Sequence, residues 1–142
     1  MATFPGASRL AAEALGAEGV QIGTRFAASE ESSAHPDFKA RITNAAEGDT
    51  VLTLKQLTPV RLIKNEFFLA VQAAERRGAT TDELKELLGS RRAKRGIFEG
   101  DLNEGELEIG QVCAAIKKIQ PAGEILDQIW TEYEKLKQRL CS

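Results

Sequence analysis

The sequence has little of several residue types on which common functional sites depend. It contains one His, two Cys, one Trp and one Tyr in 142 residues. Cys113 and Cys141 lie far apart and form no CxxC pair. We therefore expect two reduced thiols of a cytosolic protein, and no disulfide or metal site.

Long apolar runs and a dominant charge are also lacking. No uninterrupted apolar stretch approaches the roughly 18 residues of a membrane-spanning helix. The N-terminus shows no basic region followed by an apolar run, so we expect no signal peptide. The formal net charge is only −2, and no broad electrostatic field favours nucleic acid or an anionic membrane. We expect a cytoplasmic protein with neither of them as a partner.

What is present is typical of a soluble globular chain. Hydrophobic residues make up 42% and charged residues 28% of the sequence. A free domain of this length buries about 68–70% of the surface that its unfolded chain exposes, which is enough for a core. We detect no internal repeat and no low-complexity segment.

Local patterns predict a mainly helical chain with one β-ribbon. The apolar runs Thr50–Leu54 and Val60–Ile63 are separated by a Pro-containing link and predict two antiparallel strands. Thr80 and Glu83 form a capping-box pattern at the start of a short helix. Apolar periodicity and turn residues predict the helices, which cover residues 9–15 (capped by Ser8), 37–46, 66–77, 80–88, 107–119 and 121–140.

Other candidate sites have structural interpretations that fit better. His35 precedes Pro36 at a helix start, where a histidine more often caps the helix than catalyses. The basic cluster of residues 91–95 lacks interleaved aromatic residues and predicts a solvated helix face. The acidic, Gly-containing loop 99–106 does not repeat the calcium-loop spacing and predicts a turn. We therefore predict no catalytic residue and no metal ligand in this chain.

The most informative stretch is Gly16–Phe26, GAEGVQIGTRF. Val20–Ile22 predicts a short strand that Gly23 and Thr24 end, with a helix start after them. Such a strand end leaves backbone N–H groups unpaired beside a helix dipole, which suits a phosphate group. Most Gly-Thr pairs after a strand are plain turns, so the local pattern alone is weak.

A family resemblance begins at these same residues. The order from Leu15 to Phe26 resembles the last barrel strand of the nitronate monooxygenase family, formerly called 2-nitropropane dioxygenase and close kin to the FMN-dependent enoyl-ACP reductase II enzymes. The resemblance covers almost the whole chain, but only the last part of a family member. The other matching segments follow in the family's order: Ser29–Ser32, His35-Pro36, Asp49–Val51, Pro59–Arg61, Lys64-Asn65, Glu99–Asp101 and Gly110-Gln111.

The resemblance implies an α/β fold, the C-terminal part of an FMN-binding (β/α)8 TIM barrel. Residues 1–28 would be its last helix-strand unit, and residues 29–142 a mostly helical subdomain with a short β-ribbon near 50–63. As an isolated chain we expect a helix-rich α+β structure. Family members hold the flavin phosphate partly with a Gly-Gly strand end, a pattern that Met1–Ala7 lacks. The cofactor-binding residues implied here are Gln21, Ile22, Gly23 and Thr24.

Two functions remain open from the sequence. Full-length relatives oxidise alkyl nitronates, or reduce enoyl thioesters with NAD(P)H, and their catalytic histidine lies upstream of the segment present here. On that interpretation the chain contributes part of a flavin site and is inactive by itself, and the missing barrel portion or self-association covers its apolar surface. The alternative is a free-standing helical binding or oligomerisation module that has lost the flavin.

Overall fold

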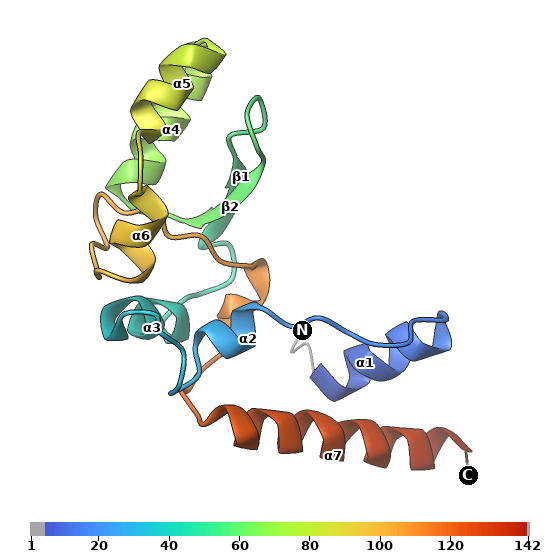
Figure 1. The fold of residues 1–142 in the computed structure, drawn as a ribbon. Coiled ribbons are helices and arrows are strands. Elements are labelled where there is room, and N and C mark those ends of the chain that lie inside the picture. Colours follow the sequence, from blue (N-terminus) through green and yellow to red (C-terminus); the bar gives the residue numbers. More distant parts are fainter. Residues whose placement is uncertain (1–4, 142) are drawn as a thin grey trace.

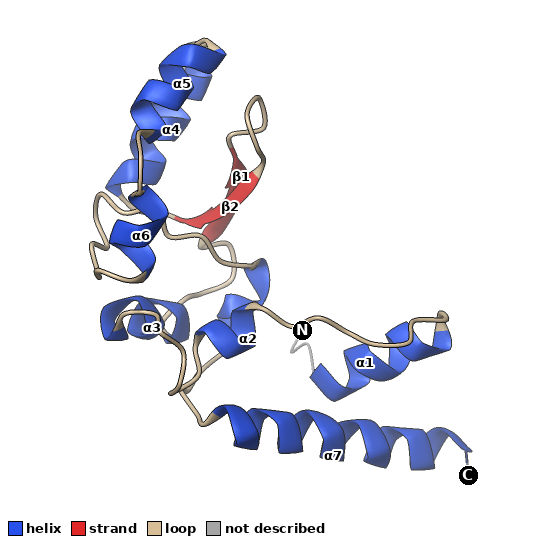
Figure 2. Ribbon diagram, in the orientation of Figure 1, coloured by secondary structure: helices blue, strands red, loops and turns tan. Residues whose placement is uncertain are grey.

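The computed structural model describes residues 5–141, a helix-rich chain with one small sheet (Figures 1 and 2). No helix in this part of the chain is long and apolar enough to span a bilayer. We divide the chain into two regions. The arm comprises residues 5–23 and 122–141, and the body comprises residues 24–120 between them.

The elements in order are α1 (Pro5–Ala14), α2 (Thr24–Ala27), α3 (Pro36–Thr43), β1 (Thr50–Thr53), β2 (Val60–Ile63), α4 (Glu66–Arg76), α5 (Thr81–Leu88), α6 (Arg92–Ile97), the 3-10 helix η1 (Gln111–Ala115) and α7 (Ala122–Cys141).

The arm consists of α1 lying along α7, with an extended segment leading from α1 back to α2 (Figure 1). The long helix α7 buries Ile125, Ile129 and Tyr133, whose spacing of four residues places them on one face. Arg9 of α1 lies over the rings of Trp130 and Tyr133, at 4.3 Å from each centroid. The two helices thus meet through a narrow apolar stripe and a stacked guanidinium.

Polar contacts at the end of α1 complete this pairing. The hydroxyl of Tyr133 donates a hydrogen bond of 2.6 Å to Glu13, and it accepts one of 2.9 Å from the ammonium of Lys137. These bonds hold the pKa of Glu13 below its ordinary value, with the Tyr133 bond as the main cause. The Cβ of any larger residue at Gly6 would lie 2.6 Å from the backbone nitrogen of Tyr133. Gly6 therefore sets how closely α1 approaches α7.

The body contains two clusters of buried apolar residues. The first lies between α3, η1 and the segments beside them, and the second packs α4 and α5 against the β-ribbon. The first cluster contains Ala28, Ala34, Phe38, Ile42, Ala45, Ile63, Leu107, Ile109, Cys113 and Ile116. The second contains Leu54, Leu62, Phe67, Phe68, Val71, Ala74, Ala79 and Leu84.

The β-ribbon is confirmed, with β1 and β2 antiparallel and Thr50 paired with Ile63. A third extended segment joins it, because Ile63 donates to the carbonyl of Leu107 and Ile109 donates to the carbonyl of Arg61. The predicted helix over 107–119 is therefore wrong, and only η1 is helical there. Pairing with β2 takes the backbone groups of residues 107–109 that a helix would need. The sequence pattern alone carries no information about that distant partner.

Helix starts follow the sequence closely. His35 is the N-cap of α3, its Nδ1 accepting from the backbone N–H of Asp37 at 3.2 Å. Asn65 caps α4 through a bond from the N–H of Phe68. Thr80 and Glu83 form the predicted capping box of α5. These caps satisfy N–H groups that the first helical turn leaves without partners.

The N-terminal predictions need two corrections. Helix α1 starts at Pro5, so Ser8 lies inside the helix and not at its cap; residues 1–4 lie outside the described part of the chain. Gly16, the residue after the predicted end of this helix, has a φ of +95°, which a glycine adopts without strain and which stops the helix. The predicted strand over Val20–Ile22 is absent. A strand is defined by its hydrogen-bonded neighbours, and the described residues offer this segment none.

The basic cluster of α6 is tied to the body more closely than a solvated face would be. Arg92 donates to the carbonyls of Leu87 and Leu88 and to Glu104, and its guanidinium lies 4.5 Å from the ring centroid of Phe67. Lys94 pairs with Glu99. These contacts join α6 to the end of α5 and to the acidic loop, so most of the cluster has a structural role.

Candidate functional site

The site begins at the extended segment between α1 and α2. Among the described residues, the backbone groups of residues 18–22 neither donate nor accept a hydrogen bond. The N–H groups of Gly23, Thr24 and Arg25 likewise find no acceptor in the described chain, while the carbonyl of Gly23 accepts from Phe26 and Ala27. A run of free main-chain donors therefore leads into the first turn of α2.

These donors lie beside a cavity of about 660 Å³, called here the larger cavity. The cavity is lined by the extended segment, by α1 and α7, and by η1 and the chain that follows it. Its residues are Ser8 and Arg9 of α1, 20–25, Val112, Ala115–Lys118, Gln120, and Ile125, Gln128, Ile129 and Glu132 of α7. All four predicted cofactor-binding residues, Gln21, Ile22, Gly23 and Thr24, are among them.

The charged side chains of this lining favour an anion. Arg9, Arg25, Lys117 and Lys118 are cationic, and Glu132 is the one carboxylate among the described lining residues. The guanidinium of Arg25 donates to the carbonyl of Lys118 at 3.1 Å and to the side-chain oxygen of Gln120, both in the segment before α7. Partial burial lowers the pKa of Arg25, which stays cationic at neutral pH.

Thr24 links the site to the body. Its hydroxyl oxygen accepts a hydrogen bond of 3.2 Å from the N–H of Gly110, just before η1. A Cβ at position 110 would lie only 2.6 Å from that oxygen. Gly110 thus permits the close approach of Thr24, the first residue of α2. Gln111, the next residue, is exposed and does not line the cavity.

Sequence reasoning missed the far wall of the cavity. Lys117, Lys118 and Gln120 precede α7, and Gln128 lies on it, about a hundred residues from the predicted site. A parallel bridge between Ser29 and Gln120, together with the bonds of Arg25, brings that segment to the site. The adjacent Lys117-Lys118 pair was the only local signal, and a pair of surface lysines is too common to indicate a site.

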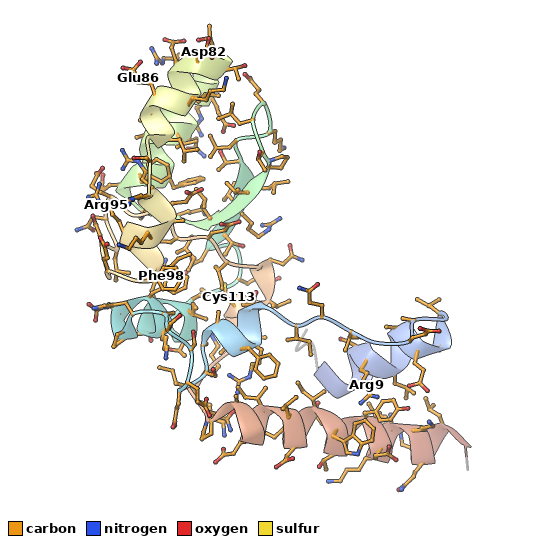
Figure 3. The ribbon with its side chains drawn as sticks, in the orientation of Figure 1. Arg9, Asp82, Glu86, Arg95, Phe98 and Cys113 are labelled. Carbon is orange, nitrogen blue, oxygen red and sulfur yellow. The ribbon has the colours of Figure 1, made fainter. Side chains whose placement is uncertain are left out.

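Two other reactive side chains lie away from the site. Cys113 is buried in the body (Figure 3), and that burial raises the pKa of its thiol, which makes it an unreactive core residue. His35 caps α3, and Gly100 lies directly against its ring, since a Cβ there would meet the imidazole at 2.4 Å. Neither residue lines the larger cavity.

Comparison with known proteins decides the family. The family model described as nitronate monooxygenase matches residues 9–132, which is most of the chain. The chain belongs to the nitronate monooxygenase family. It is 47% identical over 64 residues to a probable nitronate monooxygenase of Staphylococcus saprophyticus, and 56% identical over 43 residues to one of Bacillus subtilis.

Solved structures agree with this assignment. The chain superposes on FabK from Thermotoga maritima with a TM-score of 0.87 and 36% identity, over 98% of this chain and 44% of FabK. Against the nitroalkane oxidase of Streptomyces ansochromogenes the TM-score is 0.70 and the identity 28%, over 98% of this chain and 39% of that one.

The chain therefore spans less than half the length of the proteins that it resembles. The matched segments cover 18% and 12% of the two curated relatives. This nitronate monooxygenase family member is helix-rich and matches about 40% of the length of the two solved structures. Its division at residue 28 into a barrel unit and a helical subdomain stays a prediction.

Proposed function

We propose that this chain is the C-terminal part of an FMN-dependent oxidoreductase of the nitronate monooxygenase type, and that Gln21, Ile22, Gly23 and Thr24 hold the flavin phosphate. The single observation that carries the proposal is the set of N–H groups without acceptors among the described residues, in a segment that lines the larger cavity. Family membership supplies the cofactor, because the family is FMN-dependent.

The donors present suit a phosphate. Main-chain N–H groups at a turn before a helix are a common way to bind phosphate oxygens. Gly23 adds no side chain, and a Cβ there would meet nothing within 4 Å, so the backbone is accessible. Lys117 and Lys118 add positive charge to the opposite wall. The ammonium of Lys117 is held by the carbonyl of Ala45 at 2.8 Å, which fixes its position.

When bound, the flavin supplies the electron chemistry, and the protein binds and orients it. This chain's residues would fix the phosphate end, with Arg25 holding the segment 118–120 against α2. The substrate on this proposal is an alkyl nitronate or an enoyl thioester, the latter with NAD(P)H as reductant. We assign no general base in the chain, because its one histidine serves as a helix cap. We expect the isolated chain to oxidise no nitronate.

The second candidate is a helical binding module without flavin. It is favoured by the sequence of Met1–Ala7, which lacks the family's Gly-Gly turn. Most of that stretch lies outside the described residues, but the described part already belongs to α1 and not to a phosphate-binding turn. On this alternative the family sequence is retained and the cofactor is lost.

FMN titration separates the two functions. The purified chain is added to FMN, and flavin fluorescence is followed up to high micromolar protein. Quenching that saturates supports the flavin site, and its absence at these concentrations favours the module.

Two matched variants test the position of the phosphate. Gly23→Asp places a carboxylate among the free N–H groups, and we expect it to weaken binding at least about tenfold, since an added like charge opposes the phosphate. Gly19→Asp adds the same charge where nothing lies within 4 Å, outside the larger cavity. Equal effects of the two variants would contradict the proposed placement.

A further inference from the structure

Four of the described residues that line the larger cavity are cationic, and three of these already have partners within the chain. The guanidinium of Arg9 lies over two aromatic rings of α7, at 4.3 Å from each centroid. The ammonium of Lys117 donates to the carbonyl of Ala45, a residue that does not line the cavity. The guanidinium of Arg25 donates to two oxygens of the segment 118–120. These three side chains therefore build the walls of the cavity.

The fourth cation, Lys118, differs from the others. Its side chain is exposed, and among the described residues its ammonium has no hydrogen-bond or ion-pair partner. Glu132, the one carboxylate of the described lining, does not supply one, because it accepts from the N–H of Gly6 at 3.2 Å. An ammonium without a protein partner can bind a phosphate oxygen without first losing another contact.

The backbone of Lys118 is held in place on both sides. On one side, the bond from Lys117 to the carbonyl of Ala45 measures 2.8 Å. On the other side, Gln120 is only 4% exposed, and its carbonyl accepts from the N–H of Glu30 at 3.0 Å. The carbonyl of Lys118 itself accepts from the guanidinium of Arg25 at 3.1 Å. A long, free side chain thus starts from a fixed point of the cavity wall.

Arg25 joins this wall to the run of free N–H groups. Its own N–H belongs to that run, at the start of α2, while its guanidinium bonds to Lys118 and Gln120. The side-chain amide of Gln120 continues the connection, because it donates to Glu124 of α7 at 3.2 Å. Arg25 therefore sets how the two sides of the cavity lie relative to each other.

We propose that Lys118 is the cation that binds the phosphate at the free N–H groups of residues 23–25, and that Arg25 is a positioning residue that holds Lys118 across the cavity from them. The ligand class is a terminal phosphate group, since main-chain donors and one mobile ammonium suit its oxygens. The inference rests on the proposed function for the identity of this ligand as FMN. It deepens that function by separating one cation that binds from three that build the site.

The two adjacent lysines form a matched pair for the first test, in which FMN fluorescence gives the Kd. Lys118→Gln should raise the Kd about tenfold, because it removes a charge-assisted hydrogen bond. Lys117→Gln removes the same charge one residue away, and we expect a loss of only about twofold, as for a screened charge without contact. Equal losses would show that only the net charge matters, and would overturn the assignment of Lys118.

The second test asks whether Arg25 positions Lys118 or binds the phosphate itself. Gln120→Met removes the acceptor of the guanidinium and leaves Arg25 charged. We expect it to weaken FMN binding as Arg25→Gln does, and we expect neither change to add to the loss in Lys118→Gln. An unchanged or tighter Kd in Gln120→Met would show that the released guanidinium binds the phosphate, and would overturn the positioning role.

Circular dichroism checks that each variant is folded. If Gln120→Met does not fold, the double variant of Arg25→Gln and Lys118→Gln decides. Two independent contributions of about tenfold each would multiply to about 100-fold, whereas a positioning role predicts a combined loss close to the larger single one. A combined loss near 100-fold would therefore contradict the proposal.

Inorganic phosphate supplies a probe without flavin, followed by the broadening of its phosphorus NMR line. Broadening that Lys118→Gln removes and Lys117→Gln largely keeps supports the assignment even where FMN does not bind, and then only the proposed function fails. FMN binding with equal losses from the two lysines overturns this inference and leaves the proposed function intact. A wild-type chain that neither quenches FMN nor broadens the phosphate line overturns both.

Discussion

The body and the arm bury their apolar side chains in different ways. In the body, residues from well-separated segments meet in two clusters whose largest side chains are almost wholly excluded from water. In the arm, α7 buries one stripe of side chains, while Leu15, Trp130 and Leu140 remain 90%, 52% and 72% exposed. Large apolar side chains are also exposed in the body, such as Leu69 at 51% and Phe98 at 49%, so the two regions differ in whether they contain a buried cluster and not in whether apolar residues reach the surface.

The body and the arm also differ in the kind of contact that stabilises them. The body uses apolar packing, supported by Arg92 and by helix caps. The arm depends on Arg9, labelled in Figure 3, which lies over two adjacent aromatic rings, and on the bonds among Glu13, Tyr133 and Lys137. Surface polar contacts are individually weak, so we expect the arm to open more readily than the body.

The largest effect is expected from an aromatic truncation in the body. Phe38 is 1% exposed, and Phe38→Ala should lower the free energy of unfolding by about 3–5 kcal/mol. Trp130→Ala in the arm should cost only about 0.5–1 kcal/mol, mainly the contact with Arg9. Urea denaturation followed by circular dichroism measures both variants. If the two variants lost similar amounts of unfolding free energy, the proposed difference in packing between the body and the arm would be wrong.

A smaller loss of unfolding free energy is expected at a site in the body where two backbone segments pack closely. A Cβ at Gly105 would lie 2.3 Å from the carbonyl oxygen of Asp101 and from the Cα of Gly96, neither of which is a flexible side chain. Gly105→Ala should therefore cost about 1–3 kcal/mol. Gly123→Ala in α7 meets nothing within 4 Å and should be neutral or slightly stabilising. The midpoint of thermal unfolding should fall for the first variant and not for the second.

A still smaller and more local effect is expected at the arm's polar contact. Tyr133→Phe removes the hydroxyl that joins Glu13 to Lys137, at a cost of about 0.5–1.5 kcal/mol. Because this contact lies between α1 and α7, amide exchange should speed up in those helices and stay unchanged in α4. Faster exchange throughout the chain would show that the two regions open together.

The smallest effect is expected from pH, with opposite signs in the two regions. The folded pKa of Glu13 is lowered, so its contribution is present above its unfolded pKa and is lost as pH falls through the folded value. The folded pKa of Glu106 is raised, chiefly by burial and then by Glu108, so its ionisation costs stability as pH rises through the folded value.

Two conservative variants separate these contributions. Glu106→Gln should stabilise the body at neutral pH, with the gain disappearing under acidic conditions. Glu13→Gln should remove the acid-induced loosening of α1. Denaturation and exchange measured from neutral to acidic pH check both, and a loss of stability for Glu106→Gln at neutral pH would contradict the assigned sign.

Much of the local structure was predictable, because its causes are local. The caps at His35, Asn65 and Thr80 and the β-ribbon follow from short patterns, as does the stop at Gly16. The segment 107–109 was not predictable, because it joins β2 through bonds that residues more than forty positions away provide. The same holds for the strand expected at Val20–Ile22, which needs neighbours that the described chain does not contain.

By itself the sequence determined the helical character of the chain, the ends of α4, α5 and α7 to within a residue, and the residues that resemble the nitronate monooxygenase family, because each of these depends on neighbours within a few positions. Only the tertiary structure decided that Lys117, Lys118 and α7 form the far wall of a cavity at Gln21–Thr24, and that the backbone of residues 18–22 finds no hydrogen-bond partner in the described part of the chain. Such features depend on which distant segments meet, and hydrogen-bond partners and packed faces are fixed only when the whole chain is folded.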